Sequence, residues 1–589
     1  MRNNPNRSQR KQTVVLVSRK ALAAGECVKN MEKTPTASAL RLTVATKSTA
    51  CKAGTADKLP GHRGGFVLLV VTIVLILLSL AAWAYTNKMV IEKDATMMYG
   101  RDVEARMAAE SAIEYTAIQI GNLQKDNTLD VFHNTTLFRG QILEEVPDNP
   151  RGQCRFTVLV PNELSSSKGT SVRFGLARET AKFNINRLTE FEDDDDEATT
   201  AFGAVSFVPG MTEEIVNSIL DWIDSDEEAR VGGAESLYYE GLTVPYSCRN
   251  APLESIEELL QIQGVTPALF YGEDANRNGT LDPNEDDGNE SAPDDNADGV
   301  LDAGWREYFT ASSKERNTTS TGDEKINING TILTELYDEI EEAVGADAAK
   351  FIIAYRLWGN ENADPATVKS LTVDQKELAQ AIAGVATKED GISITRAGMN
   401  LNQVSAFSFR SIYDVIDAEV EATVDDAPQT LISPWTSSNL AGTMPDFEAQ
   451  FTHIDDAFLD GRINVNIARR EVLLAIPDMT ESIADQIVQQ RPTVESAGGS
   501  TDAMAGRVSP TWLLGEGLVD LNTFRRLGPW LTTGGDIFSF QTLGHFDQGG
   551  PTTRLEAKID ATQNPPRVIF QRDLTSLGRG FHPSELSGK

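Results

Sequence analysis

The sequence predicts an α+β fold with a long N-terminal transmembrane helix, an antiparallel sheet, and a large, mostly helical domain inserted into that sheet. Three observations indicate this architecture. An uncharged apolar run, Phe66–Ala84, leads without proline into a helix-forming stretch that ends near residue 122. Segments of alternating apolar and polar residues lie on both sides of an acidic middle part. That middle part carries amphipathic helical patterns.

The apolar run has the length and composition of a membrane-spanning helix. Thr72 and Ser79 are its only polar residues. A rise of about 1.5 Å per residue gives it a length of about 28 Å, close to the hydrocarbon thickness of a bilayer. Basic residues precede the run and an acidic body follows it, so the positive-inside rule places the N-terminus in the cytoplasm and the residues after Lys88 outside. A buried helix of a soluble core is the alternative, and no such helix needs so long an uncharged run.

Beyond the membrane, the same helix is expected to carry one apolar stripe. Helical spacing aligns alanine and isoleucine side chains along this stretch, namely Ala105, Ala109, Ala112, Ile113 and Ile120. A helix that continues to residue 122 would be about 85 Å long. The stripe requires a globular domain or neighbouring subunits to cover it.

Strands are predicted at both ends of the globular part, where apolar and polar residues alternate between turn residues. The predicted strands are Arg155–Val160, Val172–Leu176, Asp536–Gly544, Arg554–Asp560 and Arg567–Arg572.

Composition excludes several classes of protein. The 589-residue chain has a formal net charge of −34, but residues 1–64 carry thirteen Lys/Arg against three Asp/Glu, so the acidic excess lies in the rest of the chain. The strongly acidic remainder repels polyphosphate, so we expect no nucleic-acid partner. Four cysteines without a CxxC pair exclude a disulfide scaffold; Cys154 and Cys248 form one disulfide in an oxidising compartment or remain thiols. The sequence contains no HExxH, GxSxG, P-loop or GxGxxG motif, and we expect no enzyme.

The apolar run begins directly after His62-Arg63-Gly64-Gly65. Basic residues, a small residue and then Phe66 at the start of the helix resemble the class III leader of type IV pilins and type II secretion pseudopilins. The resemblance implies that a membrane aspartyl prepilin peptidase cuts after Gly65 and that Phe66 is N-methylated. Most pilins carry Glu at the fifth mature position, where this chain has Val70. In this respect the chain resembles the pseudopilin that lacks the acid, general secretion pathway protein K. A plain anchor with a chance Gly-Phe junction is the alternative.

Three short motifs repeat along the body. Lys182–Asn186, Lys325–Asn329 and Arg462–Asn466 share the pattern basic–apolar–Asn–apolar–Asn, and helical hairpins that resemble helix-hairpin-helix units follow them. Such hairpins often hold DNA phosphates, but acids crowd the first one, so we expect packing or protein contact instead. The phrases DWIDSDEEARVGGAESLYYEGL and RNAPLESIEELLQIQGVTPALF resemble the helical domain of the protein K family.

Two loops between the first and second motifs have the spacing of calcium ligands. Oxygen-bearing residues at positions 1, 3, 5, 7, 9 and 12, with glycine at position 6, wrap around one Ca²⁺. The first loop offers Asp274, Asn276, Asn278, Thr280, Asp282 and Glu285. The second offers Asp294, Asn296, Asp298, Val300 and Asp302.

Position 12 of the second loop is Trp305, so another residue or water must complete that site. We expect isolated structural Ca²⁺ loops, because no amphipathic helices flank them; a solvated acidic linker is the alternative. The protein K family also contains calcium, but the resemblance does not assign its ligands to these loops. The acidic run 192–197 is expected to be a solvated loop.

The expected organisation is a pilin-like sheet with an insertion. The parts are a basic leader or cytoplasmic segment at 1–65, the membrane and pilin-like helix at 66–123, the first part of the α/β domain at 124–190, the inserted helical domain at 191–530, and the completing strands at 531–589. The long leader is either a real cytoplasmic extension or a misassigned start, and Met31 would give a shorter one.

The resemblance implies a minor pseudopilin in the bacterial inner membrane, with its body in the periplasm at or near the pseudopilus tip. Its partners would be other minor pseudopilins, the prepilin peptidase, and the secretin or exported proteins. A minor pilin of a type IV pilus and a membrane-anchored calcium-dependent binding module are the alternatives.

Overall fold

The computed structural model describes most of the chain after the leader. The described residues are 64–123, 131–143, 145, 152–161, 172–191, 200–302, 304–359, 369–370, 395–401, 405–491 and 507–586. The basic leader and the acidic run 192–197 therefore lie outside them. The chain divides into two compact units, Met1–Asn87 and Lys88–Lys589.

Helix α2 (Gly64–Leu123) contains the predicted apolar run. Among the described residues it is the one helix that is long and apolar enough to cross a membrane. The two polar side chains of the apolar run are satisfied within the helix, because Thr72 and Ser79 each donate to the carbonyl four residues earlier at 2.8 Å. These properties are compatible with the predicted single-pass anchor.

In the second unit, strands from both ends of the globular part join in one antiparallel sheet. Its order is β1-β2-β19-β20-β21, with β3 paired to β2 and β4 paired to β19. The strands are β1 (Gln141–Ile142), β2 (Cys154–Pro161), β3 (Val172–Arg173), β4 (Ala177–Arg178), β19 (Ile537–Phe546), β20 (Thr553–Asp560) and β21 (Arg567–Asp573). The pairing of β2 with β19 brings Thr157 opposite Leu543, across most of the chain length. Of the predicted strand Val172–Leu176, only Val172–Arg173 is strand.

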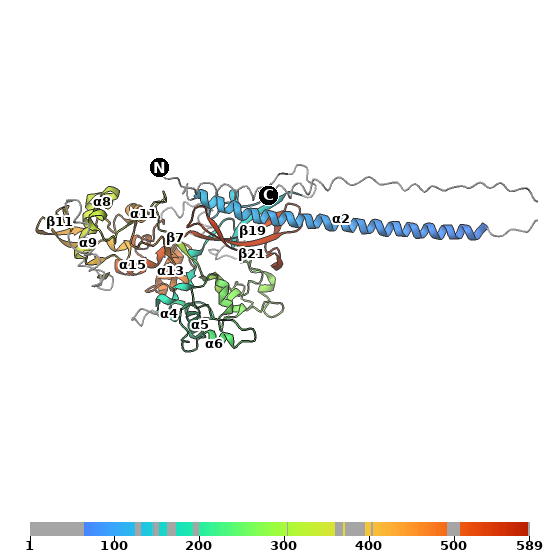
Figure 1. The fold of residues 1–589 in the computed structure, drawn as a ribbon, viewed down its shortest axis with the longest axis horizontal. Helices are drawn as coiled ribbons and strands as arrows, with labels where there is room; N and C mark the ends of the chain where they lie inside the picture. Colours follow the sequence, from blue (N-terminus) through green and yellow to red (C-terminus); the bar gives the residue numbers. More distant parts are fainter. Residues whose placement is uncertain are drawn as a thin grey trace, which may run out of the picture. The chain divides into compact units, whose positions relative to one another are not determined.

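The second half of α2 packs very closely on this sheet (Figure 1). A Cβ placed on Gly544 of β19 would lie 1.8 Å from the carbonyl oxygen of Ala105. Thr542 Oγ1 donates to the carbonyl of Ala109 at 3.0 Å. Small residues on both elements permit this approach, and Ala112 is fully buried beside them. The sheet therefore covers the predicted apolar stripe.

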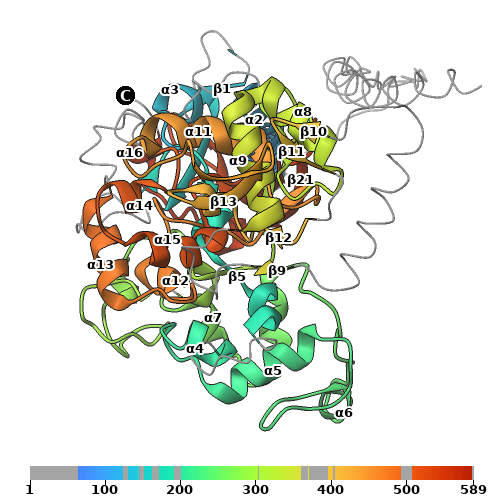
Figure 2. The same cartoon turned by 90° about the vertical axis from the view of Figure 1, so that its left-hand side faces the viewer.

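Between β4 and β19 the chain forms short helices and strands (Figure 2). Their buried apolar side chains form one hydrophobic cluster. The helices are α4 (Ala201–Val205), α5 (Glu213–Ile223), α6 (Ser236–Glu240), α7 (Pro267–Tyr271), α8 (Leu333–Val344), α9 (Ala346–Trp358), α11 (Leu440–Gln450), α12 (Arg470–Leu474), α13 (Glu481–Gln490), α14 (Trp512–Gly515) and α15 (Leu521–Leu527). A hairpin of β13 (Glu419–Val424) and β14 (Ala427–Ile432) adds sheet structure. The insertion is thus less purely helical than expected, and its boundaries as a separate domain stay a prediction.

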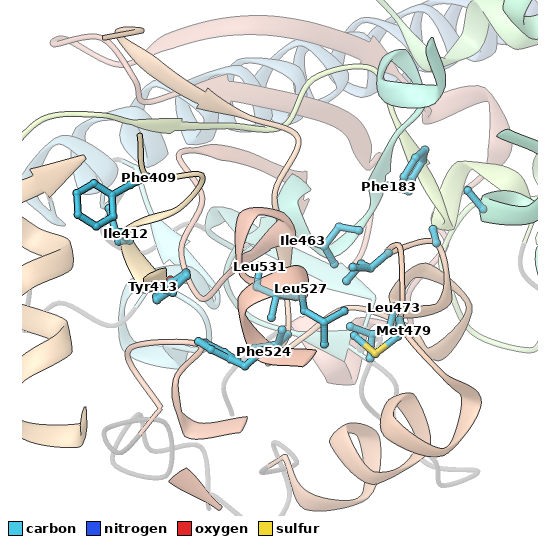
Figure 3. Packing of buried hydrophobic residues seen from close by; sticks show 14 of the residues in the cluster. Phe183, Phe409, Ile412, Tyr413, Ile463, Leu473, Met479, Phe524, Leu527 and Leu531 are labelled. Carbon is cyan, nitrogen blue, oxygen red and sulfur yellow. The ribbon is translucent and has the colours of Figure 1, made fainter. Parts of the chain in front are cut away.

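The three Asn-containing motifs adopt similar local structures. The apolar-Asn pair of each forms a two-residue strand that pairs in parallel with a strand ending in Thr. The pairs are β5 (Phe183–Asn184) with β6 (Phe309–Thr310), β8 (Ile326–Asn327) with β15 (Phe451–Thr452), and β17 (Ile463–Asn464) with β18 (Leu531–Thr532). Apolar side chains of these strands, including Phe183, Ile463 and Leu531, belong to one hydrophobic cluster (Figure 3). The assignment of the following hairpins to the helix-hairpin-helix class stays a prediction.

Candidate metal centre

The predicted cleavage junction lies in the first turn of α2. Gly65 and Phe66 are both helical, and the Phe66 side chain is exposed. Val70 is also exposed on the helix surface, where most pilins would have a glutamate. The processing of this junction stays a prediction.

The first calcium-shaped loop begins just after α7 and is organised by its first aspartate. Asp274 accepts hydrogen bonds from the backbone amides of Asn278 at 3.0 Å and Gly279 at 2.9 Å. Gly279 has a φ of +68°, which glycine adopts without strain. A Cβ on Gly279 would also lie 2.3 Å from the Cβ of Pro161 at the end of β2. The turn position therefore requires glycine for both backbone geometry and space.

The polar side chains of the first loop converge on Asp282. Asn276 Nδ2 and Asn278 Nδ2 donate to Asp282 Oδ2 at 2.5 and 2.9 Å. Glu285, which is 1% exposed, accepts from the amides of Ala275 and Asp282. Asn276 Oδ1 is buried without a hydrogen-bond partner. An amide flip would exchange Nδ2 and Oδ1 and turn this oxygen toward Asp282. A cation bound beside Asp282 requires that orientation, because it accepts oxygen ligands and not an NH₂ group. The Thr280 amide donates to Asn278 Oδ1 at 2.6 Å.

Burial and mutual repulsion make this a costly place for several negative charges. Burial, together with the nearby carboxylates of Asp274 and Asp282, raises the pKa of Glu285 to about 7, although two backbone hydrogen bonds act in the opposite direction. Burial also raises the pKa of Asp274. A divalent cation with oxygen ligands would relieve this repulsion. The donor set, the orphaned amide oxygen and the clustered acids therefore fit Ca²⁺.

The second loop is only partly as predicted. Asn296 Nδ2 donates to Asp302 Oδ2 at 3.0 Å, and the amides of Asp298 and Val300 donate to Asn296 Oδ1 and Asp298 Oδ1. Asp294 is exposed, and within the described part of the chain it accepts neither of the amides expected of position 1. Asp286 accepts the Gly299 amide instead, at 2.9 Å.

Sequence reasoning missed Glu273, which organises the second loop. Its buried carboxylate accepts from the amides of Asn296 at 3.3 Å and Asp302 at 3.1 Å. Glu285 makes the equivalent bond to position 9 of the first loop. Glu273 is thus a candidate for the carboxylate that Trp305 cannot supply at position 12. It precedes the first loop in sequence, so the spacing pattern gives no sign of it.

A third acidic group lies at the end of α5. Ligand atoms of Asp221, Asp224 and Glu235 all lie within 4.8 Å of one another. The Arg230 guanidinium forms ion pairs with Asp221 and Asp224. Glu235 is 4% exposed, and both of its carboxylate oxygens are buried without a hydrogen-bond partner. Burial, together with the neighbouring charges of Asp221 and Asp224, raises the pKa of Glu235 to about 7.

From the sequence, the acids at the end of the first hairpin indicated only a charge that repels DNA. Nothing in the sequence indicated that Glu235 joins Asp221 and Asp224, because Glu235 is remote from this pair along the chain. Nearby, Cys248 is a thiol whose Sγ donates to the carbonyl of Asp221. Cys154 in β2 is likewise a thiol, so of the two states considered for these cysteines the structure has the unbonded one.

The architecture is an apolar N-terminal helix followed by a body of mixed helix and sheet. Comparison with known proteins shows which family part of this body resembles. Residues 181–271 match the family model for Type II secretion system (T2SS), protein K. This match contains the first Asn motif and the Asp221, Asp224 and Glu235 cluster. The predicted resemblance to the protein K family is therefore confirmed for this segment, while both calcium-shaped loops follow it in sequence.

Curated relatives agree with this match. The chain is 27% identical over 183 residues to a putative type II secretion system protein K of Escherichia coli (strain K12), covering 30% of this chain and 55% of the relative. It is 26% identical over 225 residues to type II secretion system protein K of Klebsiella pneumoniae, covering 36% and 60%. The chain thus spans little more than half the length of these relatives.

Among solved structures, the GspK-GspI-GspJ complex from the enterotoxigenic Escherichia coli type 2 secretion system matches with a TM-score of 0.33 and 11% identity. The match covers 82% of this chain and 99% of the other.

Proposed function

We propose that the chain is a minor pseudopilin of a type II secretion system that supports pseudopilus assembly and protein export across the outer membrane. The observation that carries the proposal is the match of residues 181–271 to the protein K family. This segment follows an apolar N-terminal helix, whose second half packs on an antiparallel sheet. The work of such a subunit is binding and positioning.

In this proposal the chain is anchored in the inner membrane, with its body in the periplasm and other minor pseudopilins as partners. Val70 supports a place at or near the tip. A carboxylate in lipid is costly unless a partner neutralises it, so a helix with valine leaves the bilayer more easily and makes one contact fewer. Contacts with the secretin or with exported proteins would follow from the tip position.

Mass spectrometry of the mature N-terminus tests the membrane part of the proposal. We expect an N-methylated Phe66, produced by prepilin peptidase. Gly65→Leu places a bulky side chain at the cut and should leave the leader attached, whereas Gly64→Ala is the matched control and should be processed. An intact leader on the native protein would refute processing and favour a membrane-anchored calcium-dependent binding module. A minor pilin of a type IV pilus would be processed alike, so genes for a surface pilus beside this one would favour it.

We further propose that the body binds structural Ca²⁺. When bound, the ion supplies positive charge that holds carboxylate and amide oxygens of a loop in one arrangement. The first loop would provide Asp274, Asn276, Asn278, Thr280, Asp282 and Glu285. The second would provide Asn296, Asp298, Val300 and Asp302, with Glu273 in support. The unpartnered Glu235 carboxylate supports a further site with Asp221 and Asp224.

Isothermal titration of the detergent-solubilised protein with Ca²⁺ tests these sites separately. Glu285→Gln should remove the first site, Glu273→Gln the second and Glu235→Gln the third. Glu290→Gln, at an exposed residue between the two loops, is the control and should leave the titration unchanged. A titration without binding would refute the calcium proposal.

A further inference from the structure

The first calcium-shaped loop lies directly on the sheet. Its Gly279 packs on Pro161 of β2. Gln541 of β19 donates from Nε2 to the carbonyl of Arg277 at 2.8 Å. Arg554 of β20 donates to the same carbonyl at 2.7 Å and also to the carbonyl of Asn276. Three neighbouring strands, β2, β19 and β20, therefore each contact the backbone of this loop.

The same loop also contacts the C-terminal segment, residues 574–586, which follows β21. Asn278 Nδ2, which donates to Asp282 inside the loop, also donates to the carbonyl of Gly580 at 2.7 Å. The Arg554 guanidinium lies 5.4 Å from the ring centroid of Phe581. Phe581 is 5% exposed and belongs to the hydrophobic cluster under the sheet. One loop side chain thus touches both the proposed cation ligands and the end of the chain.

Arg554 makes these contacts interdependent. Its side chain is fully buried and its charge is permanent. Its other described side-chain hydrogen bond goes from Nε to Gln541 Oε1 at 2.9 Å. If the loop moved away, the buried Arg554 guanidinium would lose the two carbonyls that accept its hydrogen bonds, which is strongly unfavourable. Arg554 can then regain acceptors only if the elements that cover it, including residues 580 and 581, open toward water.

We infer that cation binding in the first loop locks the C-terminal segment onto the sheet. The inference rests on the proposed Ca²⁺ binding. Without the ion, Asp274, Asp282 and Glu285 repel one another, the loop loosens, and the carbonyls at residues 276 and 277 leave Arg554. The segment then detaches and exposes Phe581. If the loop binds Ca²⁺ with the dissociation constant of extracellular calcium modules, about 10⁻⁴–10⁻³ M, the C-terminal segment docks fully on the sheet only in a calcium-rich compartment.

Hydrogen–deuterium exchange of the full chain in detergent, followed by mass spectrometry, tests this coupling. Replacing Ca²⁺ with EGTA should raise amide exchange at least tenfold in residues 574–582. The hairpin β13–β14, which packs on α9, is the internal reference and should not change. Terbium luminescence on the same samples, compared with that of Glu285→Gln, reports whether the first loop binds a cation.

Two variants separate the coupling from folding. Gly580→Ala adds a Cβ 2.2 Å from Arg554 Nη1 at a φ of +73°; it should keep terbium binding but leave 574–582 exchanging fast with or without Ca²⁺. Gly578→Ala, where the added Cβ meets nothing within 4 Å, also has a positive φ and is the matched control. It should keep the calcium response.

Cation binding together with calcium-independent exchange at 574–582 would overturn the locking of the C-terminal segment and leave the calcium proposal standing. Absence of cation binding in the loop would overturn both. A tenfold response in the native chain that Gly580→Ala abolishes supports the coupling.

Discussion

The close contact between α2 and β19 gives the sharpest test of how this body is built. In Gly544→Ala, the added Cβ would lie 1.8 Å from the Ala105 carbonyl oxygen, 2.7 Å from its carbon and 3.0 Å from the Ala109 amide nitrogen. All three atoms belong to the helix backbone, so no side chain can rotate away. Helix and strand would have to separate by roughly 1.5 Å to reach an ordinary contact.

Overpacking of a well-packed core typically costs 1–3 kcal/mol, and a rigid contact lies at the upper end. We therefore expect Gly544→Ala to lower the stability of the body by ~3 kcal/mol and to weaken the Thr542–Ala109 hydrogen bond. Thermal unfolding followed by tryptophan fluorescence should show a melting temperature several degrees lower, and hydrogen exchange should rise first in β19.

The matched control is Gly442→Ala in α11, where an added Cβ meets nothing within 4 Å. Alanine is the better helix former, so this variant should be neutral or slightly more stable. A Gly544→Ala protein that melts together with the native one would refute the close packing of α2 on the sheet.

Three further perturbations follow from buried charges and loops. Calcium chelation should lower the melting temperature and expose 272–305 to protease; an unchanged melt would contradict structural calcium. Burial raises the pKa of Glu448 to about 7, so the folded protein binds this proton more tightly than the unfolded chain, and stability should fall by ~1–3 kcal/mol as pH rises from about 4.5 to about 7. Glu448→Gln should reduce that fall in melting scans at pH 5 and pH 8, and an identical pH profile would count against it. Arg356, 2% exposed, donates to the carbonyls of Ile328 and Phe407. Arg356→Ala would leave these buried carbonyls without a donor and should cost ~3 kcal/mol; a loss below ~1 kcal/mol in urea unfolding would contradict this stabilising role.

The elements that the sequence predicted well are those encoded locally. The uncharged run from Phe66 and the small-residue stripe around Ala109 specify α2 and its packed face without any distant contact. Strands β19 and β20 were predictable because apolar and polar residues alternate there over seven or more positions. Their order could not be predicted, because the pairing of Thr157 with Leu543 depends on how the whole insertion folds back.

The same distinction applies to the proposed metal sites. Asp274 and Gly279 interact within one turn, so their spacing alone indicates that contact, while cation binding there stays a proposal. Glu273 acts on residues more than twenty positions away, and Asp286 replaces Asp294 through a turn between the loops. Glu235 reaches Asp221 only because the chain turns back after α5. These contacts have no local pattern in the sequence.

The proposal that this chain serves protein export is tested most directly by an in-frame deletion of its gene in the bacterium that encodes it. We predict that the proteins normally found in the medium accumulate inside the cell envelope. Expression of the native chain, but not of Gly65→Leu, should restore their release. Unchanged release of these proteins from the deletion strain would contradict the proposed function.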